Sequence, residues 1–186
     1  MRIEKLRAAY DLELRWVHFP LHPETPPEGR RLDDLFAGRE AMLAEMMARI
    51  REVAAAEGLP MSDRATTYNS RLAQELGAWA DARDDGGRIH DELFRAYFVD
   101  SVNVADVDAL VAVAERAGLP AGEARQVVTE RRFRDAVDRD WRRSRQLGVT
   151  AVPTFVAGGR GVVGAQPYEV LERLVVGAGA RRRPSR

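Results

Sequence analysis

The sequence contains no cysteine. Without a thiol, the chain can form no disulfide, build no thiolate zinc site and carry no cysteine nucleophile. Lysine is almost as scarce, since Lys5 is the one lysine among 29 basic residues and all the others are arginines. We interpret this bias, together with the many alanines, as a feature of composition and not as the mark of an arginine-specific binding site.

An excess of one charge and long apolar runs are absent too. The 29 basic residues balance 29 acidic ones, so no net field favours nucleic acid or a membrane surface as a partner. No apolar run approaches the roughly 18 residues of a membrane helix, and residues 1–15 mix charged with apolar side chains, unlike a signal peptide. We expect a cytoplasmic protein of one domain, long enough at 186 residues to bury a core.

Apolar residues recur at helical spacing through most of the chain, and short segments have the composition of strands. Residues 12–19 and 152–157 are rich in branched and aromatic side chains, which favour strands, and residues 158–161 predict a hairpin turn before a short strand at 162–164. Helices are expected at 2–9, 39–57, 70–83, 87–99, 105–117, 121–129, 131–147 and from 167 onward. This order predicts an α/β fold with an all-helical insertion.

Three groupings that could bind a ligand are interpreted as structural. His18 and His22 lie on a strand end and a proline-rich loop, where four-residue spacing does not converge, and His90 is on a separate helix, so no metal site is expected. Residues 131–145 interleave arginine with aromatics, as single-strand-binding proteins do, but acid-base pairs at i,i+4 spacing favour a solvated helix face. The methionines of residues 39–57 are interpreted as helix core and not as an adaptable binding surface.

Several segments, taken in their order along the chain, resemble the DsbA family of thioredoxin-like proteins. The segment GVTAVPTFV at 148–156, followed by a hairpin, GAQP at 164–167 and a closing helix, is similar to the C-terminal half of that fold. Other segments are similar to the FrnE-like branch of the family: WVHFPLHPETPPEG at 16–29, YNSRLA at 68–73 and LFRAYF at 93–98. This branch also resembles 2-hydroxychromene-2-carboxylate isomerases and kappa-class glutathione transferases. The joint order spans residues 2–176 and is more specific than any one segment.

The resemblance implies a DsbA-type thioredoxin-like fold with a missing part. Residues 1–30 and 148–176 would form an incomplete thioredoxin-like domain, residues 31–147 a helical insertion and residues 177–186 a disordered tail. The family's Cys-x-x-Cys begins the first helix, directly after the first, central strand, and Met1 matches the latter half of that helix. The resemblance therefore implies that the first central strand is missing, that the chain holds no catalytic residue, and that the natural start lies upstream.

The resemblance also implies a ligand-binding site around Pro153. From the residues alone, the Val152-Pro153 bond fits a cis turn and an ordinary trans proline equally. The family resemblance implies the cis isomer. It also implies that the backbone of Val152 is free to pair with an extended peptide or with glutathione. Asn69 matches a glutathione-contact position, although an asparagine that begins a helix is first of all an N-cap. The amides of Ala165 and Gln166 could hold a carboxylate. The acidic residue and the serine that tight glutathione binders place nearby are absent.

Three functions follow as hypotheses. The first is a DsbA-family protein disulfide oxidoreductase homologue that is N-terminally truncated and redox-inactive as given. The second is a glutathione-dependent isomerase or transferase, with glutathione as the candidate cofactor. The third is a redox-dead module that binds an extended peptide and forms a homodimer. The expected partners are an extended peptide or a thiol-containing substrate. Nucleic acid, a membrane and a metal ion are not expected as partners.

Overall fold

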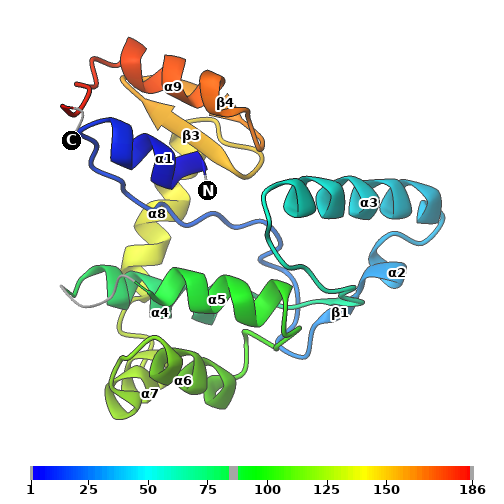
Figure 1. Ribbon diagram of the computed structural model, residues 1–186. Coiled ribbons are helices and arrows are strands. Elements are labelled where there is room, and N and C mark those ends of the chain that lie inside the picture. Colours follow the sequence, from blue (N-terminus) through cyan, green and yellow to red (C-terminus); the bar gives the residue numbers. More distant parts are fainter. Residues whose placement is uncertain (1, 84–87, 185–186) are drawn as a thin grey trace. The chain divides into compact units, whose positions relative to one another are not determined.

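The structure, a computed structural model, describes residues 2–83 and 88–184 and divides the chain into two compact units (Figure 1). Unit 1 consists of the two ends of the chain, Met1–Leu21 and Asp140–Arg186, and unit 2 is the middle, His22–Arg139. These units divide the chain at other residues than the domain boundaries expected at 30 and 148, since residues 22–30 belong to unit 2 and residues 140–147 belong to unit 1. The expected start of one helix at residue 87 lies outside the described residues.

Unit 1 packs two helices on a β-hairpin. Its elements are α1 (Arg2–Ala9), β3 (Thr154–Ala157), β4 (Arg160–Val163) and α9 (Tyr168–Gly177). The two strands are antiparallel, with Phe155 opposite Val162, and α9 packs against both strands and against α1 (Figure 1). Leu6, Tyr10 and Leu171 are buried at the centre of this unit. The strand, hairpin and closing helix predicted for this region are confirmed.

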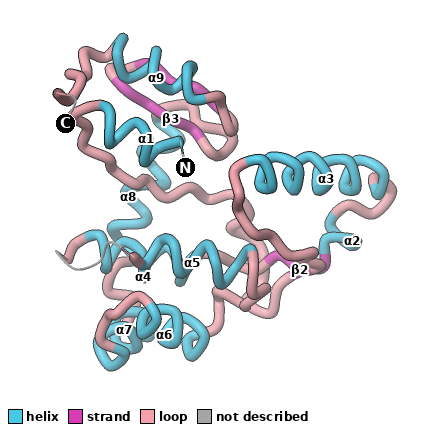
Figure 2. The backbone as a smooth tube through the Cα atoms, viewed as in Figure 1, coloured by secondary structure: helices cyan, strands magenta, loops and turns pink. Residues whose placement is uncertain are grey.

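Residues 11–20 form no strand, so the prediction of a strand at 12–19 is wrong (Figure 2). A strand exists only where a neighbouring strand accepts and donates its backbone hydrogen bonds. Among the described residues, the isolated bridge between Tyr10 and Arg182 is the nearest such pairing. The branched and aromatic composition of this segment is that of a strand, but composition alone supplies no partner.

The end of the chain is ordered where disorder was expected. The amide of Asp11 donates to the carbonyl of Arg181 at 2.8 Å, and the amide of Arg183 donates to the carbonyl of Ala9 at 2.8 Å. The Arg183 guanidinium also donates to the carbonyl of Tyr10 at 3.0 Å. Residues 181–183 thus form a short backbone pairing with Ala9, Tyr10 and Asp11, while residues 185–186 lie outside the described part.

Unit 2 is built around a bundle of short helices. Its elements are α2 (Leu32–Leu35), α3 (Glu40–Ala56), α4 (Arg71–Asp81), α5 (Ile89–Phe98), α6 (Val107–Arg116), α7 (Ala121–Thr129) and the first part of α8 (Arg134–Gln146). Helices α4 to α7 pack around an apolar cluster in which Leu76, Ile89 and Leu110 are completely buried. Within residues 2–83 and 88–184, no helix combines the length and the apolar character needed to cross a membrane.

Two details of unit 2 differ from the sequence-based expectations. A two-residue ladder pairs β1 (Arg30–Arg31) with β2 (Thr66–Thr67), so the insertion is not all helical. Strands of this length show no alternation that a sequence pattern could reveal. In addition, α3 has no buried residue, and Met42, Met46 and Ile50 are exposed. The methionines are therefore not helix core, because helical spacing defines a face without showing that anything covers it.

A buried ion cluster joins α4 to the start of α8. The Glu75 side chain is completely buried, and its Oε1 lies 2.6 Å from Nε of Arg71 and 2.6 Å from Nη2 of Arg131. Nε of Arg131 donates to the other oxygen, Oε2, at 2.7 Å, so this arginine binds the carboxylate with two bonds. Arg131 has the left-handed φ of +55°, which is uncommon outside glycine, and its two bonds to Glu75 help to hold this conformation.

Candidate functional site

The β3–β4 hairpin in unit 1 positions the site around Pro153. Gly158 and Gly159 form its turn with φ values of +56° and +76°, and such a pair of positive angles matches the twist of the strands it joins. At the other end of the hairpin, the amide of Gly164 donates to the carbonyl of Pro153 at 2.7 Å. This bond brings the segment after β4 next to the segment before β3.

Val152 and Pro153 form an exposed turn directly before β3. Their peptide bond is cis, which is the isomer that the resemblance implies. The Thr154 hydroxyl donates to the carbonyl of Ala151 at 2.6 Å and so fixes the turn from the inside. Val152 is 46% exposed, and neither its amide nor its carbonyl has a hydrogen-bond partner in the part of the chain that the structure describes.

The edge of β3 that faces away from β4 is unpaired. Opposite residues of an antiparallel pair alternate between hydrogen-bonded and non-hydrogen-bonded positions. Because Pro153 and Gly164 are hydrogen-bonded, Thr154 and Val156 occupy non-hydrogen-bonded positions in the register with β4. Their amides and carbonyls therefore point away from β4, where no described residue pairs with them. We call the backbone groups of Val152, Thr154 and Val156 the β3 edge.

Ala165 and Gln166 follow Gly164 and lie beside this turn. The Gln166 amide already donates to the carbonyl of Gly164 at 2.8 Å, whereas no described residue accepts a hydrogen bond from the amide of Ala165. Nη1 of Arg2 donates to the carbonyls of both residues, at 2.8 and 2.7 Å, and so ties α1 to this loop. Only one of the two expected amide donors is therefore available to a ligand, and both precede α9, which begins at Tyr168.

Asn69 belongs to unit 2, where its side chain has structural partners. Its amide nitrogen donates to the carbonyl of Pro23 at 3.2 Å and to that of Thr25 at 2.7 Å. Its oxygen accepts from the amide of Arg71, the first residue of α4, at 2.9 Å. The N-cap of α4 is Ser70, so the N-cap prediction for Asn69 is wrong; Asn69 lies one residue earlier, bonds the first amide of the helix and fastens the proline-rich loop. The other four candidate residues, Val152, Pro153, Ala165 and Gln166, are all in unit 1.

A polar cluster in unit 1 was not foreseen from the sequence. Nδ1 of His18 lies 2.8 Å from Oδ2 of Asp140, and the backbone amide of His18 donates to the same oxygen at 3.2 Å. The Ser144 hydroxyl donates to the carbonyl of Asp140 at 3.0 Å and to that of His18 at 3.3 Å. These bonds fasten the segment after α1 to α8. No local pattern reveals them, because 122 positions separate His18 from Asp140.

In unit 1, the carboxylate of Glu172 holds two tyrosines together. Glu172 on α9 accepts a hydrogen bond from Tyr10 at 2.9 Å and one from Tyr168 at 3.3 Å. The bond to Glu172, followed by burial, raises the pKa of Tyr10, and burial, followed by the charge of Glu172, raises the pKa of Tyr168. Among the described residues, no three His, Asp or Glu side chains converge as a metal site would require.

Comparisons with known proteins agree with this fold. The model of the DSBA-like thioredoxin domain matches residues 1–176. A solved structure described as a probable DsbA oxidoreductase from Streptomyces coelicolor is 32% identical, with a TM-score of 0.86, over 100% of this chain and 85% of that one. A 2-hydroxychromene-2-carboxylate isomerase structure is 19% identical, with a TM-score of 0.72, over 96% of this chain and 85% of the other. The uncharacterised protein YwbO of Bacillus subtilis (strain 168) is 24% identical over 89% of this chain and 82% of its own length.

The chain belongs to the family of DSBA-like thioredoxin domains. Its α/β fold is therefore the DsbA-type thioredoxin-like fold expected from the sequence, with few and short strands in the described residues. The likeness to the isomerase shows the fold alone. Since the 186 residues include no cysteine, none of them can supply the thiolate that disulfide exchange requires.

Proposed function

We propose that this chain is the substrate-binding part of a DsbA-family protein disulfide oxidoreductase and that it binds an extended peptide along the β3 edge. The observation that supports this most directly is the row of unpaired backbone groups at Val152, Thr154 and Val156. An extended peptide can add to such a row as a further strand, which gives affinity through main-chain hydrogen bonds. Val152 and Val156, which are 46% and 48% exposed, offer apolar contacts to side chains of the peptide.

Redox chemistry is the part of the family's activity that these residues do not provide. The attacking and the leaving group in disulfide exchange are both thiolates, and the sequence has no cysteine to supply either. In this proposal, the thiol comes from outside these residues, and the chain alone is redox-inactive. Placement in the FrnE-like branch and a cytoplasmic location belong to the same proposal and are supported only by the sequence motifs and composition.

We expect the purified 186-residue protein to show no reductase turnover. With dithiothreitol as the reductant and insulin as the substrate, the rate should equal that of a blank without protein, because no thiol on the chain can form a mixed disulfide. A thioredoxin with its two cysteines serves as the positive control. A rate above the blank that rises in proportion to the concentration of the protein would contradict the inactivity.

Peptide binding at the β3 edge is expected to depend on the backbone amide of Val156. A proline at this position removes one donor from the β3 edge but none from the pairing with β4. The probe is a short labelled peptide of alternating valine and threonine. Val156→Pro should weaken its binding by about tenfold. Fluorescence anisotropy gives the dissociation constant. Val163→Pro is the matched control, because Val163 is similarly exposed at 51% and occupies a non-hydrogen-bonded position opposite Thr154, with its amide on the far edge of β4.

The outcomes separate strand addition from other modes of binding. Equal affinities for the Val156→Pro and Val163→Pro proteins, or undiminished binding of a peptide whose alternate amides are methylated, would rule out strand addition at the β3 edge. Glutathione added as a competitor tests the second hypothesis, for which the free amide of Ala165 is the supporting observation. Sedimentation of both proteins tests the homodimer, because two β3 edges joined about a two-fold axis would separate in the Val156→Pro variant but not in the control.

A further inference from the structure

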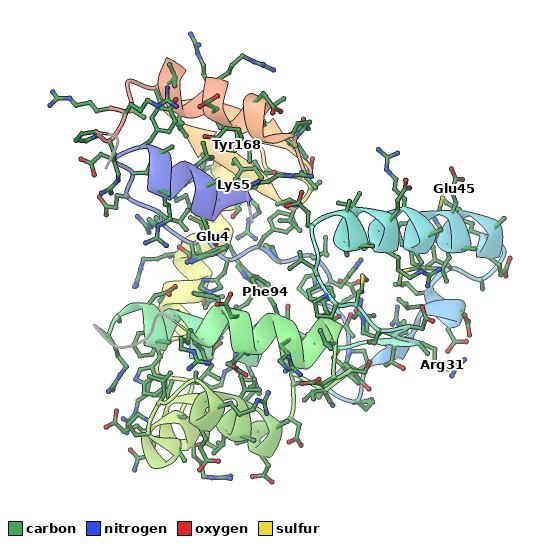
Figure 3. The ribbon with its side chains drawn as sticks, in the orientation of Figure 1. Glu4, Lys5, Arg31, Glu45, Phe94 and Tyr168 are labelled. Carbon is green, nitrogen blue, oxygen red and sulfur yellow. The ribbon has the colours of Figure 1, made fainter. Side chains whose placement is uncertain are left out.

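An open surface pocket of about 280 Å³, called the cavity below, lies in unit 2 beside α3. Glu45 of α3 is not among its lining residues and points away from α2 (Figure 3). Its walls include the apolar side chains of Leu32, Leu43 and Met47. None of the residues of α3 is fully buried, so the inner side of this helix is not closely packed against its neighbours. The cavity combines an apolar wall with charged groups, which is the usual chemistry of a small-molecule site.

Arg64 is the charged group of this cavity whose bonding is incomplete. Its guanidinium lies over the ring of Tyr97, at 4.1 Å from the centroid, and 5.6 Å from the ring centroid of Phe98. Its Nε and Nη1 atoms are buried, and neither has a hydrogen-bond partner among the described residues. The aromatic faces attract the positive charge but do not replace hydrogen-bond acceptors. A ligand cannot reach these two covered atoms, but Nη2 is not among the buried atoms, and a negative charge bonded there would compensate the charge of the whole guanidinium.

The other charges of the cavity neutralise one another. Arg51 pairs with Asp63 at 2.5 Å, and Asp33 pairs with Arg31 at 2.7 Å. In contrast, no carboxylate within residues 2–83 and 88–184 forms an ion pair with Arg64. The uncompensated charge of the cavity is therefore positive and located on Arg64. A ligand that complements this site carries one negative charge next to an apolar body.

We propose that the cavity binds a small monocarboxylate, with the carboxylate paired to Arg64 and the apolar body against Leu43 and Met47. Its volume is close to the lower limit of about 300 Å³ for small-molecule sites, which suits a short aliphatic chain. This site is independent of the proposed function, since all its residues belong to unit 2 and the β3 edge belongs to unit 1. Failure of either proposal therefore leaves the other standing.

The proposal is tested by calorimetric or NMR titration of the full chain with two ligands, hexanoate and hexan-1-ol. These ligands share an apolar chain and differ in charge. We expect hexanoate to bind at one site and hexanol at least tenfold more weakly, with the methyl signal of Met47 shifting on addition of hexanoate. In the Arg64→Gln protein, hexanoate should bind no better than hexanol. Arg173→Gln removes an exposed arginine of α9 in unit 1 and should keep the wild-type difference.

Equal binding of the two ligands to the wild-type protein would overturn the proposal, as would an unchanged preference for hexanoate in a folded Arg64→Gln protein. If that variant does not fold, Ala65→Leu provides the second test, because Ala65 lines the cavity and is exposed. The larger side chain should narrow the cavity, leave Arg64 in place and reduce hexanoate binding by at least tenfold. Undiminished binding to the Ala65→Leu protein would show that hexanoate binds elsewhere and would overturn the site.

Discussion

Replacing Glu75 with alanine is expected to lower the free energy of unfolding by about 3–5 kcal/mol. The carboxylate is completely buried and is held by Arg71 and Arg131, so the change removes the shared partner of both guanidinium groups and leaves Arg71 with its ion pair to Asp138, at 2.8 Å. A loss of this size is a large fraction of the stability of an ordinary domain. Urea unfolding followed by circular dichroism at 222 nm measures it, since most helices of the chain are in unit 2.

Two variants serve as controls for the Glu75 cluster. Glu75→Gln keeps the shape of the side chain and one acceptor oxygen, so its loss of stability should be smaller than that of alanine. Glu52→Ala removes an exposed carboxylate from α3 and should change the free energy of unfolding by no more than about 0.5 kcal/mol. An alanine variant at position 75 that unfolds at the same urea concentration as the Glu52→Ala protein would show that the cluster does not stabilise the fold.

The same cluster gives the stability of the protein a defined dependence on pH. Burial alone would raise the pKa of Glu75, but the hydrogen bonds and charges of Arg131 and Arg71 outweigh it and hold the pKa below its usual value. The unfolded chain therefore binds a proton at this group more readily than the folded one, so the stabilisation is present above the unfolded pKa of about 4.3 and is lost as the pH falls through the folded value. Urea midpoints between pH 7 and pH 3 should fall less steeply in Glu75→Gln than in the wild type.

Replacing Gly29 with alanine is expected to cost about 2–4 kcal/mol of unfolding free energy. Gly29 has a φ of +91°, a conformation that side chains with a Cβ atom rarely adopt. An added Cβ would also lie 2.6 Å from Cδ1 of Tyr68 and 2.8 Å from Cγ2 of Thr66, which is too close for any real contact. The expected result is a lower urea midpoint and a proline-rich loop that no longer packs beside β2.

Gly38→Ala separates the two causes. Gly38 also has a positive φ, of +76°, but no described atom lies within 4 Å of a Cβ built there. This variant therefore carries the conformational cost alone, of about 1–2 kcal/mol. The difference between the two variants measures the steric cost at Gly29, and equal losses would mean that Tyr68 and Thr66 move away without penalty.

The longer helices were predictable because their signals are local, whereas the four-residue α2 was not expected. Residues 2–9 and 121–129 coincide with α1 and α7, since periodic apolar residues and nearby helix-ending residues mark such segments within a few turns. The strand expected at 12–19 failed for the opposite reason, because pairing depends on a distant partner. The same limit applies to β1 and β2, which consist of two residues each. Arg31 pairs with Thr66 across 35 positions, and Arg30 pairs with Thr67 across 37.

The candidate site was predictable only in part, and mostly through the family resemblance. The turn at Val152 and Pro153 and its neighbour Ala165 were found in this way, because their order along the chain is characteristic of the family. The sequence could not show that the Gln166 amide is already bonded to Gly164, or that Arg2 ties the loop to α1. The bonds of Arg2 form when segments more than 160 positions apart meet in the folded chain, whereas the bond from Gln166 to Gly164 depends on the local turn geometry.

The backbone pairing of residues 181–183 with Ala9 and Asp11 has a practical consequence for protein engineering. The match to the family ends at residue 176, so a deletion designed from that match would remove the pairing along with the tail. The segment after α1 would then lose its bonds to Arg181 and Arg183. The beginning and the end of this sequence behave as one structural element, and a fusion partner is better added after Arg186 than substituted for the arginine-rich tail.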